Sequence, residues 1–393
     1  MRNLQRSYVG TAIVALFALL AGCVPQTSAQ PQIKRLTVPP GFRVSVYSDK
    51  VPGARQMVLD EKGTLFVGSI IPNTVYALPD RNKDGKADEV ITVASKLNHP
   101  NGVAVRNGAL YIGEISKITR YDDIEGQLAK PANAQGERSF TSKVVTDKLP
   151  NVEWHGYRYI RFGPDDLLYF GVGAPCNVCE RPDERFGTLM RMKPDGSDLE
   201  IFAKGIRNTV GFDWHPETRQ LWFTDNGRDY LGENLPPDEL NCAPEKGMHF
   251  GFPYRYGNNV PDPEFGVKAP KGIKFTPPVM PLGPHVASLG MRFYTGNAFP
   301  EKYRGNVFIA EHGSWNRDKK IGYRIQMVTL ENGKATKYET FLSGFHQGDD
   351  AWGRPVDLCM MPDGSMLVSD DRCGAIYRIS YVGGGSAPSP KPN

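Results

Sequence analysis

The sequence predicts an all-β chain that folds as a six-bladed β-propeller. One motif of strand, tight glycine-containing turn, strand, variable loop and strand recurs six times along the chain, as in a repeat architecture. The 393 residues include 42 glycines and 32 prolines, which suit short strands joined by turns. Helical periodicity is weak outside a few short stretches. Because each such unit buries its faces only against neighbours, the regular recurrence favours a propeller over the alternative, a pair of β-sandwiches.

The repeats follow one another along most of the chain. They span residues 55–78, 101–121, 155–193, 207–223, 288–328 and 354–380. Residues 42–47 are expected to supply the outer strand that closes the ring. Long insertions follow the second strand of the third, fourth and fifth repeats, at 172–187, 224–285 and 311–322. Loops on one rim of a propeller gather over the central channel, so we expect a site there.

The N-terminal residues resemble a targeting segment. Arg2 and Arg6 precede an apolar run, 9–20, that is too short to span a membrane comfortably. Leu20-Ala21-Gly22-Cys23 resembles a bacterial lipobox, in which the Cys23 thiol is lipidated; an uncleaved anchor and an ordinary secretory signal are the alternatives. We therefore expect an exported protein, lipid-anchored to the cell envelope and facing the periplasm or the exterior. The expected parts are a signal peptide (1–23), a flexible tether (24–37), the propeller (38–381) and a disordered tail (382–393).

The composition is that of a globular protein with a sizeable core. Hydrophobic residues make up 40% of the chain and charged residues 23%, and the formal net charge is +4. No basic run interleaved with aromatic residues is present, so a nucleic-acid partner is not expected. The motifs HExxH, P-loop, GxSxG and GxGxxG after a strand are missing, which leaves nicotinamide, ATP and serine-hydrolase chemistry unsupported.

Five cysteines follow the lipobox, and an exported location permits disulfides. Cys359 and Cys373 fall on neighbouring strands of one predicted hairpin pair, so we expect a bridge between them. Cys176 and Cys179 form a CxxC motif, but neither a βαβ context nor a second CxxC supports a redox or zinc role. Of Cys176, Cys179 and Cys242, one is left unpaired, and the sequence does not say which.

Polar residues begin the innermost strands of all six repeats. They are Arg55, Asn101, His155, Arg207 with Asn208, Ser288 and Arg354. Innermost strands surround the channel, so these side chains should converge at one mouth. Such positions can be polar only because they contact water. The three arginines, however, suit a planar polyanion, because guanidinium groups pair with carboxylates and stack on aromatic faces. His155 is a candidate general base, with a structural histidine as the alternative. His312 ends another strand at the same rim, and Trp315 nearby offers a ring for stacking.

Calcium is the second candidate ligand. The segment 80–89 places Asp80, Asn82 and Asp84 at alternate positions with a glycine sixth, like the first half of an EF-hand loop. Ile91 stands where that loop has its bidentate glutamate, so a plain polar turn is an equal alternative. Loop 224–241 is a second oxygen-rich segment, located at the rim.

An ordered set of motifs resembles the soluble quinoprotein sugar dehydrogenases, the glucose/sorbosone dehydrogenase family with its pyranose dehydrogenase relatives. The similarity covers about residues 40–381. The motifs are His155 with Arg161-Phe162-Gly163-Pro164-Asp165, Gly205-Ile206-Arg207-Asn208, Asp238-Glu239-Leu240-Asn241, His249-Phe250-Gly251-Phe252-Pro253, His312-Gly313-Ser314-Trp315-Asn316-Arg317 and Gly353-Arg354-Pro355-Val356-Asp357.

The resemblance implies a six-bladed propeller that oxidises a sugar, an aldose or a sorbosone-like compound, with pyrroloquinoline quinone and calcium. By match, His155 takes the substrate proton while a hydride goes to the quinone. The cofactor would lie against Arg207, Asn208, His312, Trp315, Arg317 and Arg354. The main-chain carbonyls of Gly227 and Arg228 match the calcium ligands. The lysine by which glucose-oxidising members hold the cofactor has no counterpart, and Val356 replaces a second arginine.

Two other hypotheses about the function stay open. A calcium-dependent propeller hydrolase, such as a lactonase, would place Glu, Asp and Asn at the strand starts; here these positions carry three arginines and a histidine. A non-catalytic propeller that binds a partner at the cell surface is the other. As a dehydrogenase, the protein would need an external electron acceptor, a quinone or a cytochrome, and would meet the membrane only through its lipid anchor.

Overall fold

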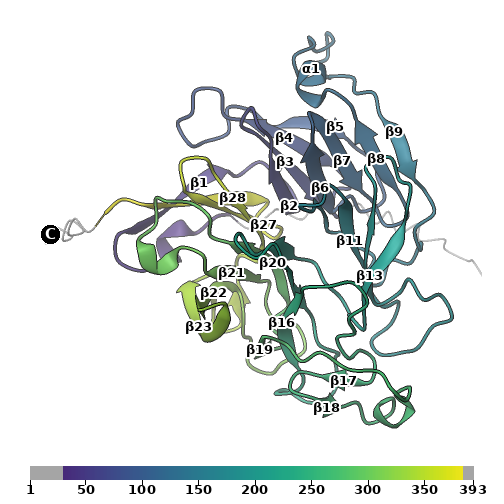
Figure 1. Cartoon of the computed structure of the whole chain (residues 1–393). Helices are drawn as coiled ribbons and strands as arrows, with labels where there is room; N and C mark the ends of the chain where they lie inside the picture. The colour runs from purple at the N-terminus through teal and green to yellow at the C-terminus, as the bar shows by residue number, and fades with distance from the viewer. Residues whose placement is uncertain (1–29, 384–393) are drawn as a thin grey trace, which may run out of the picture.

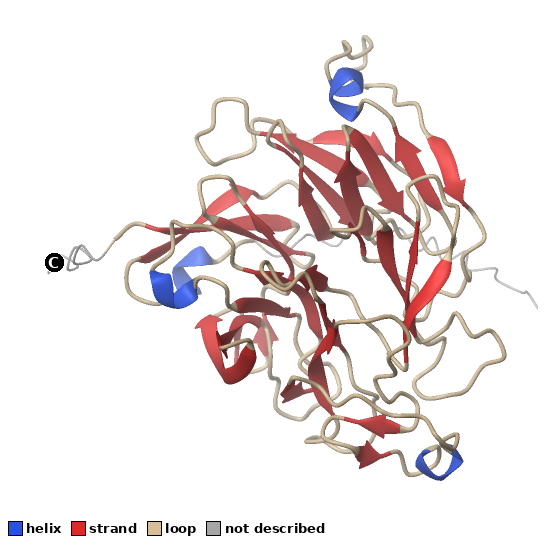
Figure 2. Ribbon diagram, viewed as in Figure 1, coloured by secondary structure: helices blue, strands red, loops and turns tan. Residues whose placement is uncertain are grey.

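In the computed structural model, which describes residues 30–383, the chain forms six four-stranded antiparallel sheets arranged as the blades of a propeller (Figure 1). Strands dominate, and the helical segments are few and short (Figure 2). The predicted six-bladed β-propeller is confirmed. The predicted signal peptide with Cys23, the first part of the predicted tether and residues 384–393 of the predicted tail lie outside the described residues.

The first three blades follow the chain, each from its inner to its outer strand. Blade 1 comprises β2 (Ala54–Leu59), β3 (Thr64–Ser69), β4 (Val75–Pro79) and β5 (Ile91–Ala94). Blade 2 comprises β6 (Gly102–Arg106), β7 (Ala109–Gly113), β8 (Ile118–Tyr121) and β9 (Lys143–Thr146), with α1 (Ile124–Leu128) between the last two. Blade 3 comprises β10 (Ile160–Phe162), β11 (Leu168–Val172), β12 (Thr188–Met192) and β13 (Glu200–Lys204).

The last three blades carry the longer loops. Blade 4 comprises β14 (Phe212–Trp214), β15 (Leu221–Asp225), β16 (Pro237–Ala243) and β19 (Met280–Pro284). Blade 5 comprises β20 (Ser288–Phe293), β21 (Val307–Glu311), β22 (Arg324–Glu331) and β23 (Lys334–Leu342). Blade 6 comprises β26 (Pro355–Met360), β27 (Met366–Asp370), β28 (Ala375–Tyr381) and β1 (Phe42–Ser48). Small additions are the pairs β17–β18 (Arg255–Tyr256, Val260–Pro261) and β24–β25 (His346–Gln347, Asp350–Ala351) and the 3-10 turns η1 (Ile33–Arg35), η2 (Gly266–Lys268) and η3 (Glu301–Tyr303).

The ring is closed by the N-terminal strand, as predicted for residues 42–47. β1 pairs with β28, with Phe42 opposite Tyr381, so the first and last strands of the chain share one blade (Figure 1). The ring of Phe42 meets those of Phe299 and Phe341 edge-on, at centroid distances of 4.7 and 5.0 Å. Such pairs add about 0.5–1.5 kcal/mol each beyond the burial of apolar area. The closing blade is therefore held by both strand pairing and aromatic packing.

The inner strands approach closely around the channel. A Cβ atom on Gly211 would lie 2.1 Å from the main-chain oxygen of Leu289 in the next blade, so only glycine fits there. Gln56 of blade 1 donates to Ile160 O at 2.6 Å and accepts from the amides of Ile160 and Val103, which ties three blades together. At the C-terminal ends of the inner strands, all six blades line a cavity of about 480 Å³. The strand starts, which carry the predicted site residues, therefore lie at the opposite end.

Three expectations about segments need correction. The insertion 224–285 is not one loop, because Pro237–Ala243 forms β16 and Met280–Pro284 forms β19. The tether expected over 24–37 ends earlier, since the η1 turn packs Ile33 against the core of blades 5 and 6 and the amide of Thr37 donates to Ser343 O at 2.9 Å. The propeller's pairing also reaches Val382, whose amide donates to Gly41 O at 2.8 Å.

Within residues 30–383, no helix is both long enough and apolar enough to cross a membrane.

Candidate functional site

Arg55, at the start of β2, is held by residues of the two neighbouring blades. Its Nε donates to Asn101 Oδ1 at 2.9 Å and its Nη1 to Asp371 Oδ2 at 2.8 Å. Asn101 in turn donates from Nδ2 to the main-chain oxygen of Arg158 at 2.9 Å. The Arg55 side chain is only 5% exposed, so this ion pair is screened little by water. Arg55 is fixed in position, and its charge is compensated by Asp371.

His312 and Arg354 lie on the other side of Asp371. His312 Nε2 is 2.9 and 3.0 Å from the two carboxylate oxygens of Asp371. Burial lowers the pKa of His312 to about 4, so a neutral imidazole donates this bond at neutral pH. Burial alone would raise the pKa of Asp371, but the neighbouring His312 and Arg55 outweigh it and keep that pKa below its usual value. An ionised carboxylate therefore links Arg55 to His312.

Arg354 has main-chain partners in place of a carboxylate. Its Nε donates to His312 O and its Nη2 to Gly313 O, both at 3.2 Å, and its guanidinium lies over the Tyr323 ring, 5.8 Å from the centroid. Burial lowers the pKa of Arg354. Its side-chain hydrogen bonds in the part of the chain that the structure describes run only to carbonyls. A largely buried guanidinium without a carboxylate partner is suited to bind an anion.

Arg207, before β14, is bonded through all of its guanidinium nitrogens. Nε donates to Asn177 O at 2.8 Å, Nη1 to Gly227 O at 2.9 Å, and Nη2 to Asn177 Oδ1 at 2.9 Å and Asp229 Oδ2 at 3.0 Å. The main-chain amide of Arg207 donates to Asp225 Oδ2 at 2.9 Å. Burial, with Glu239 nearby, raises the pKa of Asp225 to about 8. Arg207 is a fixed element that joins three loops.

Asn208 and Ser288 belong to the same network. Asn208 donates from Nδ2 to Asn226 Oδ1 at 3.3 Å, and Asn226 donates from Nδ2 to Ser288 O at 2.7 Å. Asp238, buried in β16, accepts the amides of Ser288 at 2.9 Å and Gly227 at 3.0 Å. Burial raises the pKa of Asp238 to about 6.

His155 sits beside Arg207 with a defined ring orientation. Its backbone is left-handed, with φ 54°, a conformation that non-glycine residues rarely adopt and that often marks functional positions. Nδ1 lies 2.8 Å from Ala174 O, and the amide of Ala174 donates to Arg207 O at 2.8 Å. Burial and the charge of Arg207 lower the pKa of His155 to about 3. Because a carbonyl only accepts, Nδ1 carries the proton and Nε2 is the basic atom.

Close packing behind His155 depends on Gly173. A Cβ atom at this position would lie 2.5 Å from His155 Cβ and 3.2 Å from Asn208 Oδ1. His155, Asn208 and Arg207 are therefore neighbours, as the sequence predicts, although they do not begin strands: they lie in the loops before β10 and β14, which start at Ile160 and Phe212. The strand starts form two networks, one around Asp371 and one around Arg207 with His155 beside it.

The three long loops do meet over this mouth. Asn177 follows β11, Asp229 follows β15 and Asn316 follows β21. Asn177 donates from Nδ2 to Asp229 O at 3.1 Å, and Asn316 donates from Nδ2 to Asp229 Oδ1 at 2.8 Å. Asp229 is the junction, which agrees with the expectation that these loops gather on one rim.

Trp315 and Arg317 lie outside the two networks. The Trp315 side chain faces solvent, 65% exposed, with its ring edge-on to the exposed Tyr230 at 6.1 Å. Arg317 donates to the main-chain oxygen of Glu233 and to Asn234 Oδ1 at 3.4 Å. Arg317 thus ties two loops together, and its predicted role against a cofactor stays a prediction.

The predicted calcium ligands are the main-chain carbonyls of Gly227 and Arg228, and calcium binding there stays a prediction. The carbonyl of Gly227 already accepts Nη1 of Arg207, and a guanidinium on that oxygen opposes a second cation. The Arg228 side chain pairs with Asp262 at 2.6 Å. Residues 30–383 contain no cluster of three or more His, Cys, Asp or Glu side chains able to hold a metal, an observation that concerns side chains and not main-chain carbonyls.

The second predicted calcium site is a polar turn whose oxygens cap main-chain amides. Asp80 accepts the amides of Asp84 at 3.2 Å and Gly85 at 3.0 Å, Asn82 accepts that of Asp84 at 2.9 Å, and Asp84 accepts that of Lys86 at 2.9 Å. Calcium binding at Asp80, Asn82 and Asp84 stays a prediction.

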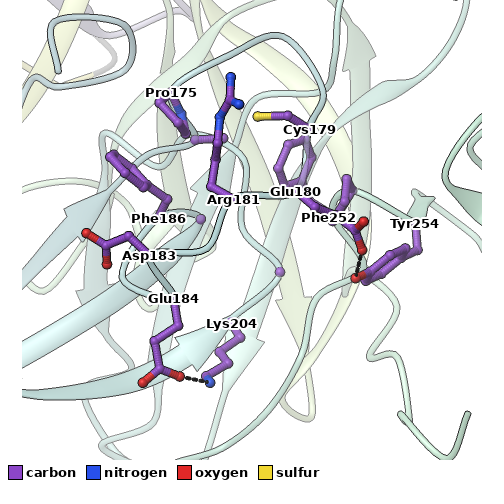
Figure 3. Close-up of a pocket in the computed structure, with 14 residues that line it drawn as sticks. Pro175, Cys179, Glu180, Arg181, Asp183, Glu184, Phe186, Lys204, Phe252 and Tyr254 are labelled. Carbon is purple, nitrogen blue, oxygen red and sulfur yellow. Dashed lines mark hydrogen bonds and ion pairs between the residues drawn. The ribbon is translucent and has the colours of Figure 1, made fainter. Parts of the chain in front are cut away.

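A pocket of about 250 Å³ (Figure 3) is lined in part by Ala174, whose main-chain oxygen accepts from His155. Its walls are the loop from Ala174 to Gly187 and the segment from Phe252 to Tyr254. Lys204 and Glu184 pair across one side at 2.9 Å, and Tyr254 donates to Glu180 at 2.6 Å. Cys179 lies in the wall (Figure 3).

The disulfide predictions are answered differently for the two groups of cysteines. Cys176 and Cys179 form a disulfide, and Cys242 is the cysteine left over. The bridge expected between Cys359 and Cys373 is wrong, because both are free thiols. Cys359 lies near the end of β26, opposite Leu367, whereas Cys373 lies in the turn after β27 and donates to Trp352 O, before the start of β26. The two thiols are at opposite ends of the strand.

Sequence reasoning missed Asp371, Asn177 and Arg158. Arg158 is 1% exposed and donates from Nε to Ile115 O and from Nη2 to Pro150 O, which fixes the backbone three residues after His155. A signal for Asp371 exists, since the polar pairs Asp225-Asn226, Glu311-His312 and Asp370-Asp371 end second strands alike. For Asn177 the CxxC spacing was the only clue.

The chain matches the model of a family described as a domain of unknown function (DUF7133) over residues 28–377. A protein of Borreliella burgdorferi described as uncharacterized is 36% identical over 361 residues, which cover 90% of this chain and 93% of that protein. A pyrroloquinoline quinone-dependent pyranose dehydrogenase of Coprinopsis cinerea is 30% identical over 129 residues, which cover 27% of this chain and 17% of that enzyme.

Similarity to a solved structure extends over nearly the whole propeller. The holo form of the pyrroloquinoline quinone domain of pyranose dehydrogenase from Coprinopsis cinerea superposes with a TM-score of 0.71, at 20% identity, over 89% of this chain and 98% of that chain. At this identity the likeness establishes the shared fold.

Proposed function

The chain belongs to the family described as a domain of unknown function (DUF7133), and we propose that it is a sugar dehydrogenase that uses pyrroloquinoline quinone. The observation that carries the proposal is the state of His155. Its Nδ1–H is committed to Ala174 O, which leaves Nε2 as a lone-pair acceptor, without a partner among residues 30–383. A general base with this fixed tautomer, next to a mouth rich in arginine, fits oxidation of a hydroxyl group.

The mouth fits the quinone, which is planar and carries three carboxylates. Arg354 is the strongest support, because burial lowers its pKa and its side chain bonds only to main-chain carbonyls in the described part of the chain. An anion there would add to the charge of nearby Asp371 in offsetting the cost of a largely buried cation. Arg55 and His312 would lie on the same side of the cofactor, and Arg207 and Asn208 on the other. Calcium has no comparable support from these residues, so no step is assigned to it.

The bound quinone would supply the two-electron acceptor for a hydride from the substrate carbon. His155 Nε2 takes the proton of the reacting hydroxyl, while the Ala174 carbonyl holds the imidazole in place and stabilises the positive charge that forms on it. Arg207 supplies a fixed positive charge beside that base. The loops joined at Asp229 cover the mouth and limit the access of water.

The proposal also covers the substrate class, the electron acceptor and the cellular location. The exposed rings of Trp315, Tyr230 and Trp154 lie within three residues of His312, Asp229 and His155 in the sequence, and aromatic faces suit the apolar faces of sugars. The substrate is then an aldose or a sorbosone-like sugar, with electrons passed to an external quinone or cytochrome. We further propose export and lipid anchoring through Cys23.

The test uses residues 24–393, purified and loaded with pyrroloquinoline quinone. Calorimetry measures binding of the quinone with Ca²⁺ and, separately, with a chelator; reduction of an artificial dye is then followed with a panel of aldoses, sorbosone and uronic sugars. Quinone-dependent turnover supports the proposal, and the protein without quinone is the control. Absence of both tight quinone binding and turnover would overturn it.

A further inference from the structure

The Cys176–Cys179 disulfide closes a short ring that contains Asn177, and Asn177 bonds both Arg207 and Asp229. Its main-chain oxygen accepts Nε of Arg207 at 2.8 Å, and its Oδ1 accepts both Nη2 of Arg207 at 2.9 Å and the amide of Asp229 at 2.8 Å. Its Nδ2 donates to Asp229 O at 3.1 Å. Every polar group of the Asn177 side chain is therefore used on Arg207 and Asp229.

The disulfide explains how a loop residue maintains four bonds. Residues 173–187 connect β11 to β12 without regular secondary structure, so the loop itself does little to restrict the backbone at Asn177. The cysteines are three positions apart in the sequence. Stabilisation by a disulfide grows with the length of the loop it closes. So short a ring adds little to global stability, and its effect falls on the two residues inside it.

The position of the Arg207 side chain depends on the acceptors that Asn177, inside the disulfide ring, offers it. Its side chain is only 5% exposed, and without the Asn177 side chain Nη2 would lose one of its two acceptors, while the main-chain oxygen of residue 177 would still accept Nε. Buried donors without acceptors are costly, so the guanidinium would move or draw in water. Asp229, which also receives Asn316, would lose the acceptor of its own amide.

We propose that Asn177 is a positioning residue, fixed by the Cys176–Cys179 ring, that sets the place of Arg207 and of the Asp229 junction beside His155. It acts through these residues and touches no reacting atom. The inference rests on the proposed function only for its kinetic readout. Its structural readout, the protection of the Asp229 amide, does not depend on any activity.

The disulfide can be opened chemically, because Cys179 lies in the wall of the pocket beside it (Figure 3). Dithiothreitol attacks one sulfur, the S–S bond breaks, and the second thiol of the reagent closes its own cyclic disulfide. Cys176 and Cys179 end as two thiols, and the two electrons come from the reagent.

The experiment compares Asn177→Ala, Asn177→Asp and the double substitution Cys176→Ser with Cys179→Ser in the full chain. Hydrogen exchange resolved at the Asp229 amide is the first readout, and kcat and KM of the quinone-loaded protein are the second. Asn306→Ala is the control, because the Asn306 side chain also bonds main-chain groups, to Lys302 O and from the amide of Leu330, but lies away from the mouth.

Asn177→Ala should raise exchange of the Asp229 amide on the order of tenfold, as expected for one lost hydrogen bond. It should also lower kcat with a smaller change in KM. Asn177→Asp keeps the oxygen that Arg207 and Asp229 use but loses the Nδ2 donor to Asp229 O, so it should restore protection of the Asp229 amide only in part. The double serine variant and the reduced protein should resemble each other and lie between wild type and Asn177→Ala.

Two results would overturn the inference. One is wild-type protection of the Asp229 amide in Asn177→Ala. The other is an equal, general rise in exchange in Asn177→Ala and Asn306→Ala, which would make Asn177 an ordinary structural residue. If the wild-type protein oxidises no sugar, the proposed function fails, and the exchange readout alone then decides the role of Asn177.

Discussion

Nδ1 of His155 and the carbonyl oxygen of Ala174 are 2.8 Å apart. The carbonyl oxygen has no proton to give, so this one contact fixes the tautomer of the imidazole and leaves its basic nitrogen, Nε2, for the substrate. Ala174 belongs to the loop after β11, and its amide donates to Arg207 O. The base and the neighbouring cation are thus positioned by a single loop residue.

Substitution of His155 by alanine should abolish turnover and spare the cofactor. We expect kcat to fall on the order of 10²–10⁴-fold, the usual contribution of a general base. Binding of pyrroloquinoline quinone by calorimetry should change little, because the arginines remain. Loss of quinone binding together with activity would instead assign His155 to holding the cofactor.

The pH dependence of folding stability should reflect the lowered pKa of His155. Burial and Arg207 lower the pKa of His155 to about 3, so the unfolded chain, with its ordinary histidine, binds the proton first as the pH falls. The His155 contribution to stability is therefore fully present above about pH 6.5 and is lost progressively toward pH 3. Melting temperatures of wild type and His155→Gln, measured from pH 7 to 4, should fall more steeply for wild type. Parallel curves would contradict the assignment.

Gly173→Ala should inactivate the protein without unfolding it. The added methyl group would lie 2.5 Å from His155 Cβ and 2.7 Å from its main-chain oxygen, so the histidine must shift. We expect kcat to fall at least about tenfold, since small misplacements of a catalytic group are costly. Gly266→Ala is the control: its φ is not positive, and its nearest contact is a milder 3.1 Å. Unchanged kinetics in Gly173→Ala would show that His155 is not the base.

The sequence predicts the blades because their inner and middle strands are apolar and their turns carry glycine. It does not predict the outer strands as well, since β9 and β23 are largely exposed and have mixed composition. The sequence pattern does not predict β16, for another reason. Its sequence, from Pro237 to Ala243, includes Asp238, Glu239 and Asn241, which are buried and hydrogen-bonded to main-chain amides or to one another. A hydrophobic pattern cannot reveal such a strand.

For the site, the strand starts were predictable, and their partners less so. An acidic residue ends or directly follows the second strand in four blades, as Glu114, Asp225, Glu311 and Asp370. Asp225 and Asp370 accept the amides of Arg207 and Arg354, and this repeat is visible in the sequence. The pairing of cysteines is not visible in the sequence, because Cys359 and Cys373 are close in sequence but belong to opposite ends of a blade. Loop contacts such as that of Asn177 depend on how blades are placed in space.

Arg354→Ala should weaken the binding of pyrroloquinoline quinone. A charge-assisted bond contributes about 1.5–3 kcal/mol, so we expect the dissociation constant to rise on the order of tenfold to a hundredfold. Arg43→Ala, an exposed arginine on β1, is the control and should bind as wild type does. Equal affinities of the two variants, measured by calorimetry, would remove the main support for the cofactor's place.

Asp371→Asn should destabilise the folded protein strongly. The substitution leaves Arg55, whose side chain is 5% exposed, without the negative charge 2.8 Å away, and leaves Arg55 and His312 one acceptor oxygen in place of two. Breaking a buried ion pair costs about 3–5 kcal/mol, because the remaining charge is uncompensated. The exposed pair of Arg81 and Glu89 is the matched control, with side chains 59% and 38% exposed. Glu89→Gln should cost no more than about 1 kcal/mol, as surface pairs do. Urea unfolding measures both, and equal midpoints would mean that Asp371 does not hold the arginine that begins blade 1.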